Sequence, residues 1–289
     1  MTLTGPASHS YFSQRLKLHY ADWGNESAPP LILLHGGQDH GRSWDWVAQE
    51  LQADWHVIAP DLRGHGDSQW TSDGNYGVLD FVYDLAQLVQ QLDLSPVTIV
   101  AHSLGGNIAL RYTGLYPDRV SKLVAIEGLG PSPEVQAKRD TLPFDALIRD
   151  WIDDKHKAAG RQPKRYASFA DALARMHGEN AYLSDAQARH LTEHAVIRNE
   201  DGSYSWKFDP HMRIWPPLDL PPDRVEQLWG QISCPTLLLY GEDSWASNPE
   251  KDGRLRHFNT ARVVSFEKAG HWLHHDQFDR FMTEIRAFL

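Results

Sequence analysis

A serine in the first half of the chain stands where a strand-like run of apolar residues passes directly into a helical pattern. The run covers residues 97–100, and Ser103 follows it between two small residues, Ala101 and Gly105. A serine hydroxyl is a weak nucleophile at neutral pH, so it needs a nearby base and a backbone that presents its oxygen. A tight strand-to-helix turn does this in the Gly-x-Ser-x-Gly pattern, although Ala101 replaces the first glycine here. These residues predict that Ser103 is a nucleophile.

Histidines follow two other strand-like runs. Residues 31–34 lead into His35, which is followed by Gly-Gly-Gln, and residues 263–266 lead through a short Lys-Ala-Gly segment to His271. Residues 60–68 form a Pro-Asp-x-Arg-Gly-x-Gly-x-Ser loop after a further strand-like run. In this order along the chain, the motifs closely resemble those of the α/β-hydrolase fold family.

The resemblance implies a role for each residue of a catalytic site. Ser103 is the nucleophile, and His271 is the general base that takes its proton and later donates it to the leaving group. Backbone amides must also stabilise the oxyanion that forms during acyl transfer. We assign this role to the amides of Leu104 and Gly37, with the amide of Gln38 as the alternative to Gly37.

The acid that orients the histidine has two candidates. Most members of the family carry it three residues after the glycine that follows the strand-like residues 236–240, but Ser244 occupies this position here. Asp243 lies one residue earlier, and a loop can absorb that shift. Glu127 directly follows the strand-like residues 123–126, where some relatives carry a catalytic glutamate. Both loops lie at the carboxyl edge of the predicted sheet. We favour Glu127 and keep Asp243 as the alternative.

A serine nucleophile in this family implies acyl transfer to water. We therefore predict a serine hydrolase that cleaves carboxylic esters, including lactones, of small or medium apolar substrates. Hydrolysis of thioesters, amides or carbon–carbon bonds uses the same residues and is an alternative. A second alternative is a ligand-binding receptor with little turnover, against which the intact nucleophile and base argue.

Two other groups of residues could suggest a metal or a nucleotide. His271, His274, His275 and Asp276 are close in the sequence, but they lack the helical His-Glu-x-x-His spacing of catalytic zinc sites. Residues 64–66 read Gly-His-Gly, without the lysine of a phosphate-binding loop. We therefore predict no metal and no cofactor.

The elements that must position these residues show two hydrophobic patterns. Residues 31–34, 97–100 and 236–240 are nearly continuous apolar runs, which are typical of parallel strands covered on both faces. The intervening residues 81–92 and the C-terminal residues 278–289 place apolar side chains on one helical face. Alternating strands and helices predict an α/β fold with a doubly wound, mostly parallel sheet.

The alternation stops after residue 130 and resumes after Cys234-Pro235. Residues 131–230 show helical patterns, no convincing strand and a proline-rich exit, and they are the weakest part of the resemblance. We predict a core of residues 1–130 and 231–289 and a helical cap of residues 131–230. In the family, insertions at this point cover the active site. Large apolar residues of the cap could line a substrate pocket, and we select Trp151, Trp206 and Trp215.

Composition restricts the partners. The 289 residues include 28 Lys and Arg against 38 Asp and Glu, giving a formal net charge of −10. This charge argues against nucleic acid and anionic membranes as partners, so we expect a small-molecule ester or lactone. The one cysteine, Cys234, cannot form an intramolecular disulfide. Residues 1–6 have no basic segment typical of a signal peptide, so we expect a cytoplasmic protein. The sequence does not indicate an oligomeric state.

Overall fold

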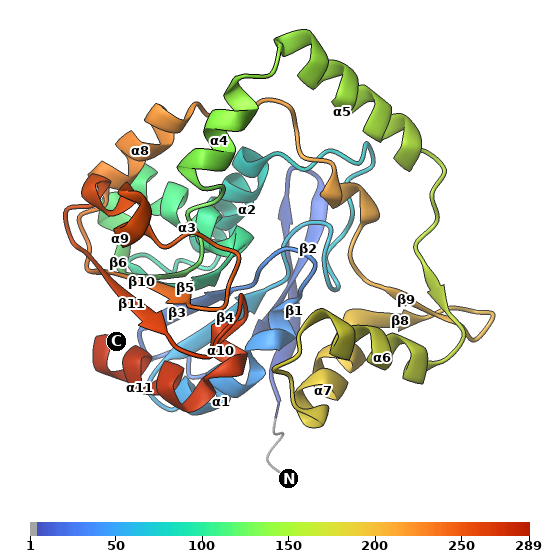
Figure 1. Ribbon diagram of the computed structural model, residues 1–289. Helices are drawn as coiled ribbons and strands as arrows, with labels where there is room; N and C mark the ends of the chain where they lie inside the picture. Colours follow the sequence, from blue (N-terminus) through green and yellow to red (C-terminus); the bar gives the residue numbers. More distant parts are fainter. Residues whose placement is uncertain (1–4) are drawn as a thin grey trace.

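A twisted sheet of eight strands forms the centre of the computed structural model, which describes residues 5–289 (Figure 1). The strand order is β1-β2-β4-β3-β5-β6-β10-β11; β2 pairs antiparallel with β1 and with β4, and the other strands are parallel. The strands are β1 (Ala7–Ser13), β2 (Leu16–Asp22), β3 (Pro30–Leu34), β4 (His56–Pro60), β5 (Val97–His102), β6 (Val120–Ile126), β10 (Thr236–Gly241) and β11 (Ala261–Phe266). The predicted fold class is confirmed.

Helices cover both faces of the sheet, which explains the continuous apolar strands. On one face, Phe81 of α2 and Ile108 of α3 belong to a buried cluster with Ile32 and Ile99 of the sheet. On the other face, α1 and α11 pack with the alternate strand residues. The helices that follow the core strands are α1 (Asp45–Leu51), α2 (Val78–Gln91), α3 (Leu104–Leu115), α8 (Pro222–Gln231), α9 (Pro249–Asp252), α10 (Leu273–Asp276) and α11 (Phe278–Phe288). Short 3-10 helices are η1 (Gly41–Trp44), η2 (Pro117–Arg119), η3 (Pro210–Arg213) and η4 (Arg254–His257).

The segment between β6 and β10 lies outside the large sheet and extends from α4 to the small sheet beside α6 and α7 (Figure 1). Its helices before α8 are α4 (Pro133–Asp140), α5 (Phe144–Ala158), α6 (Phe169–Glu179) and α7 (Asp185–Ala195). A capping box formed by Ser184 and Gln187 begins α7.

This segment also contains strands, which differs from the purely helical cap that we predicted. The antiparallel strands β7 (Arg165–Tyr166), β8 (Val196–Arg198) and β9 (Tyr204–Trp206) form a sheet in the order β7-β9-β8. Each is only two or three residues long, so a period of two cannot be recognised in the sequence.

The last helix of the predicted cap packs on the core. Val225 and Trp229 of α8 are buried in the same cluster as Ile108 of α3. The two helices approach so closely that a Cβ atom on Gly114 would lie 2.4 Å from the carbonyl oxygen of Leu228. Helix α8 therefore belongs to the layer that covers the sheet, although we predicted that the cap extends to residue 230.

No helix within residues 5–289 is long and apolar enough to cross a membrane. Residues 1–4, on which the signal-peptide prediction partly rests, lie outside the described residues.

Candidate active site

Ser103 occupies a strained turn between β5 and α3. Its φ and ψ angles are 52° and −115°, a conformation that residues other than glycine rarely adopt. The turn is held by the Ser103 amide, which donates to the Ile126 carbonyl at 2.7 Å. A Cβ atom on Gly105 would lie 2.5 Å from the His35 carbonyl oxygen. The small residue is thus required for the loop after β3 to pass beside the serine.

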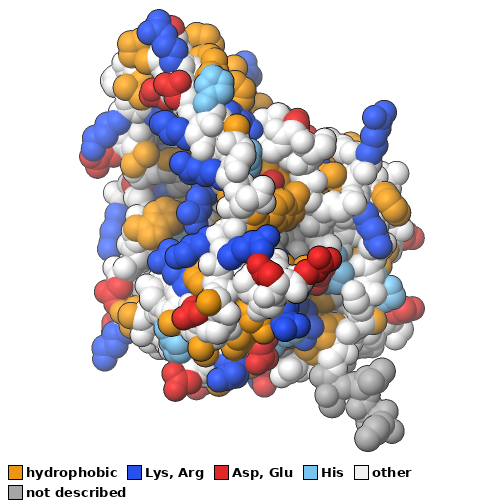
Figure 2. Space-filling model, turned by 90° about the vertical axis from the view of Figure 1, so that its right-hand side faces the viewer, with side chains coloured by type: hydrophobic (Ala, Val, Ile, Leu, Met, Phe, Trp, Pro, Cys, Tyr) orange, Lys and Arg blue, Asp and Glu red, His pale blue; other side chains and the backbone are white. Residues whose placement is uncertain are grey.

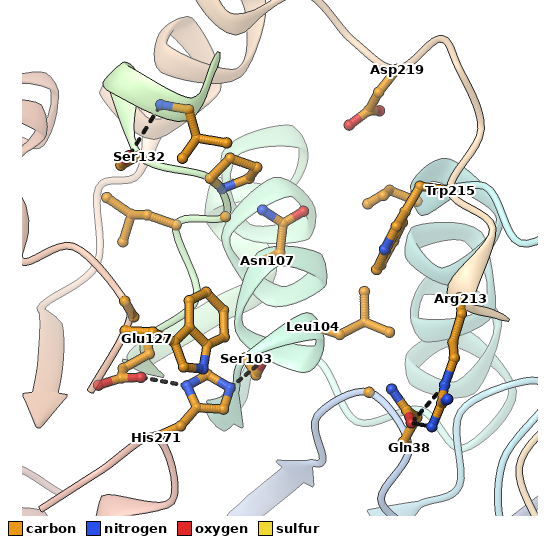
Figure 3. A pocket seen from close by; sticks show the side chains of 18 of the residues that line it. Gln38, Ser103, Leu104, Asn107, Glu127, Ser132, Arg213, Trp215, Asp219 and His271 are labelled. Atoms are coloured by element: carbon orange, nitrogen blue, oxygen red, sulfur yellow. Dashed lines mark hydrogen bonds and ion pairs between the residues drawn. The ribbon is translucent and has the colours of Figure 1, made fainter. Parts of the chain in front are cut away.

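His271 lies between Ser103 and Glu127 (Figure 3). It comes from the loop between β11 and α10, and its Nε2 is 2.9 Å from Ser103 Oγ. Its Nδ1 is hydrogen-bonded to Glu127 Oε2. Because a carboxylate accepts hydrogen bonds, Nδ1 carries the proton and Nε2 is left with a lone pair facing the serine hydroxyl. This arrangement can remove a proton from Ser103.

The Glu127 carboxylate is buried and held by three residues. Glu127 directly follows β6, and its residue surface is 5% exposed. Besides His271, the Gly241 amide donates to Oε1 at 2.8 Å and the Ser244 hydroxyl donates to Oε2 at 2.6 Å. Fixed donors of this kind keep the carboxylate oriented towards the imidazole.

Asp243, the alternative acid, is directed elsewhere. Its side chain is exposed, and its Oδ2 accepts a hydrogen bond from the Tyr182 hydroxyl at 2.7 Å. The structure therefore brings Glu127, and not Asp243, to His271.

The amides assigned to the oxyanion differ in their surroundings. Leu104 is the first residue of α3, and both Leu104 and Gly37 line the cavity above Ser103. The Gln38 amide instead donates to His65 Nε2 at 2.9 Å. Because this amide already has a partner, the geometry favours Gly37 over Gln38 as a donor to substrate.

A cavity of about 1830 Å³ opens above Ser103, between the sheet edge and the segment from α4 to β9. Figure 2 shows the face of the molecule that carries this segment, where Lys and Arg side chains gather. Trp206 and Trp215 line the cavity, as we predicted. Figure 3 shows Trp215 on the cavity wall above Leu104.

Trp151 does not line this cavity, so its predicted place there was wrong. It lies on α5, and Lys155 Nζ is 5.9 Å from the centre of its ring. The residues that α5 contributes to the cavity are Phe144 and Leu147, near its first turn. Trp151 lies one turn beyond Leu147 on the same side of α5, outside the part of the helix that lines the cavity.

Sequence reasoning missed two residues of the site, Ser244 and Trp245. Ser244 binds Glu127, as described above, whereas the Trp245 ring lies 4.6 Å from the His271 ring at an angle of 37°. Trp245 is 77% exposed and forms part of the cavity wall. Both residues lie in the loop that follows Gly241. Our prediction for this loop named only a carboxylate, although the serine at the usual position of the acid pointed to Ser244.

Possible metal ligands occur away from Ser103. Within residues 5–289, Asp45, His190 and His194 come close enough to share an ion, as do His19, Asp61 and Asp67. The Asp45 carboxylate, however, accepts hydrogen bonds from the Arg42 guanidinium at 2.6 to 2.9 Å. A cation there would have to displace the arginine, so these donors fit a structural ion pair better than a metal site.

Comparisons with known proteins point to one family. The family model described as alpha/beta hydrolase fold matches residues 29–278. A serine hydrolase-like protein of Danio rerio is 28% identical and covers 76% of this chain and 67% of its own length. The esterase Rv0045c of Mycobacterium tuberculosis is 28% identical and covers 92% of this chain and 84% of its own. The structure of the thioesterase domain from the curacin biosynthetic pathway has a TM-score of 0.82 at 23% identity, and the match covers 97% of this chain and 99% of that domain. Because the family model spans most of its length, this chain belongs to the α/β-hydrolase fold family.

Proposed function

We propose that this protein is a serine hydrolase that cleaves carboxylic esters, including lactones, through an acyl-enzyme on Ser103. The observation that carries the proposal is the hydrogen-bonded series Ser103, His271 and Glu127 at the base of a large cavity. The esterase and serine hydrolase-like relatives support the same chemistry.

Each step uses groups already in place. Ser103 Oγ attacks the substrate carbonyl carbon while its proton passes to His271 Nε2. Glu127 stabilises the imidazolium, and the amides of Leu104 and Gly37 donate to the oxyanion. When the intermediate collapses, the bond to the alcohol breaks and His271 protonates the leaving oxygen. Water then attacks the acyl-enzyme by the same route and releases the acid.

The segment between β6 and α8 is proposed to act as a cap that selects the substrate. It supplies Trp206 and Trp215 to the cavity wall, together with Phe144 and Leu147. Apolar and aromatic walls of this kind bind the apolar part of a small ligand. Esters of medium-sized apolar acids or alcohols are therefore the expected substrates.

The proposal is tested with a fluorophosphonate probe and a series of p-nitrophenyl esters of graded acyl length. The wild-type protein should be labelled at Ser103 and should hydrolyse at least one ester. Ser103→Ala should abolish labelling and lower kcat by about 10⁴ or more, since removing one member of such a triad has this effect. A folded Ser103→Ala variant with more than a tenth of the wild-type turnover would exclude Ser103 as the nucleophile. Ligand binding without labelling would favour a receptor.

A further inference from the structure

An arginine of the cavity wall faces the substrate space beside the loop that follows β3. Arg213 ends η3, and its Nε and Nη2 both donate to Gln38 Oε1, at 3.1 and 2.6 Å. Figure 3 shows the Gln38–Arg213 pair on one side of Ser103, with His271 and Glu127 on the other. The guanidinium is therefore held by the side chain of the residue that follows Gly37, the proposed oxyanion donor.

The charge of Arg213 is not matched by a carboxylate of the protein. Three other arginines of the same cavity are paired with carboxylates: Arg111 with Asp219 at 2.6 Å, Arg254 with Asp252 at 2.7 Å, and Arg175 with Glu179. Arg139 and Arg161 also have no carboxylate oxygen within 4.0 Å among residues 5–289, and Arg213 differs from them because Gln38 of the loop after β3 holds it. Across residues 5–289, Arg213 has no Asp or Glu oxygen within 4.0 Å of its side-chain nitrogens. The side-chain oxygen of Gln38 is neutral, so it does not balance the charge of Arg213. Because Arg213 is exposed, the remaining N–H donors of its guanidinium stay available.

Three of the carboxylates that line the cavity have hydrogen-bond donors of their own. Asp219 accepts from Arg111, Glu179 from Arg175, and Asp243 from the Tyr182 hydroxyl. An anion that enters the cavity beside the loop after β3 would thus meet the Arg213 guanidinium, which has no counter-charge.

We propose that Arg213 is a specificity-determining residue that binds an anionic oxygen group, a carboxylate or a phosphate, on the substrate of Ser103. A planar guanidinium binds either group through two parallel N–H···O hydrogen bonds. Gln38 fixes the orientation of the guanidinium, and Gln38 adjoins the oxyanion loop. We therefore expect the anionic group on the part of the substrate that faces this loop. This inference rests on the proposed ester hydrolysis and names the substrate class for it.

The test compares esters that differ in one charge. p-Nitrophenyl hemiglutarate carries a free carboxylate, p-nitrophenyl valerate is its neutral counterpart, and the p-nitrophenyl ester of 4-phosphonobutanoic acid carries a phosphonate. Hydrolysis by Ser103→Ala is subtracted, because a neighbouring carboxylate can cleave its own ester without an enzyme. The wild-type protein should show a higher kcat/KM for an anionic ester than for the valerate. The preferred anion distinguishes carboxylate from phosphate as the natural group.

Substitution of Arg213 should affect only the anionic esters. Arg213→Gln should lower kcat/KM for the preferred anionic ester roughly ten- to a hundredfold, the effect expected for lost charge-assisted hydrogen bonds, and should change the valerate value less than about threefold. Arg213→Lys should restore part of the loss. Arg161→Gln is the matched control, since Arg161 also lines the cavity and its substitution removes the same charge.

Several outcomes would overturn the inference. An equal loss on all three esters would show that Arg213 only positions the oxyanion loop. A wild-type preference for the valerate, or an equal effect of Arg161→Gln, would exclude a specific anion site. If no ester is hydrolysed and Ser103 is not labelled, the proposed function fails instead. Calorimetric titration of glutarate into Ser103→Ala, with and without Arg213→Gln, then decides the anion site: binding that requires Arg213 supports it, and no binding overturns it.

Discussion

Glu127 reaches His271 from the strand next to the one that carries the acid in most members of the family. β6 and β10 are adjacent, with Ile126 opposite Leu239, and the Glu127 amide donates to the Leu239 carbonyl at 3.0 Å. Residues just beyond the two strands therefore start from neighbouring points at one edge of the sheet. Ser244, at the usual position of the acid, donates its hydroxyl to the Glu127 carboxylate.

Replacing each candidate acid by its amide separates their roles at the level of single residues. Glu127→Gln keeps the size of the side chain but removes the charge that stabilises the imidazolium, so kcat on a reactive ester should fall by about 10⁴. Asp243→Asn should keep at least a tenth of wild-type kcat, because Asp243 binds Tyr182. The reverse pattern would make Asp243 the acid.

The position of Ser244 predicts that the acid can be moved within this site. Its Oγ lies 2.6 Å from the Glu127 oxygen that binds His271, so a carboxylate at 244 starts close to the imidazole. Adding Ser244→Asp to Glu127→Gln should raise kcat at least about tenfold above that of Glu127→Gln alone. The control is Ser244→Asn in the same background, which should give no gain. Equal kcat values for the two double variants would show that position 244 cannot support the histidine.

Single residues differ in how far the sequence could identify them. Ser103 directly follows a strand and His271 follows one after a short loop, and the structure places their side chains in contact. The choice between Glu127 and Asp243 stayed open in the sequence, because it depends on which side chain turns inward from a loop. Trp245 was missed for the same reason: its contact with His271 depends on the path of the loop after Gly241.

Whole elements were predictable where they are long and buried. The apolar runs of β3, β5 and β10 follow from burial on both faces of the sheet, and the apolar face of α2 follows from packing on one of them. The segment between β6 and α8 lacks that constraint, because the sides of its helices meet solvent as well as a cavity. Periodicity identified helices there, but it could not show that Trp215 lines the cavity and Trp151 does not.

This difference between the two tryptophans predicts which of them controls substrate choice. Trp215→Ala should lower kcat/KM for a bulky or long-chain ester roughly three- to thirtyfold more than for the acetate, since about 1–2 kcal/mol of apolar contact is lost. Trp151→Ala is the matched control on α5 and should leave the ratio unchanged. The two ratios come from p-nitrophenyl ester kinetics of purified, folded variants. A change with Trp151→Ala alone would mean that the cavity wall has been assigned to the wrong residues.

At the scale of the whole molecule, buried histidines connect the loops to the core. His35 Nε2 accepts from the Leu62 amide, and His65 Nε2 accepts from the Gln38 amide, each at 2.9 Å. Such rings must be neutral, because a protonated nitrogen cannot accept a hydrogen bond. Burial lowers the pKa of five histidines from 6.5 to about 4 or about 3: His35, His40, His65, His194 and His275.

These histidines predict that the fold loses stability in mild acid. Their folded pKa values lie below the unfolded value of 6.5, so the unfolded chain binds more protons as the pH falls, and stability that is complete above pH 6.5 is lost towards pH 4. Burial raises the pKa of Asp39 to about 7, which opposes this trend, but it is one group against the five histidines. The free energy of unfolding should fall by several kcal/mol from pH 7 to pH 5, on the order of 1 kcal/mol per histidine and pH unit. Urea unfolding followed by tryptophan fluorescence measures this free energy.

His275→Leu removes one such group, whose Nε2 has no partner within residues 5–289. The pH dependence of the unfolding free energy should become shallower by about one proton. Equal stability at pH 7 and pH 5 would show that the unfolded chain takes up no extra protons in this range.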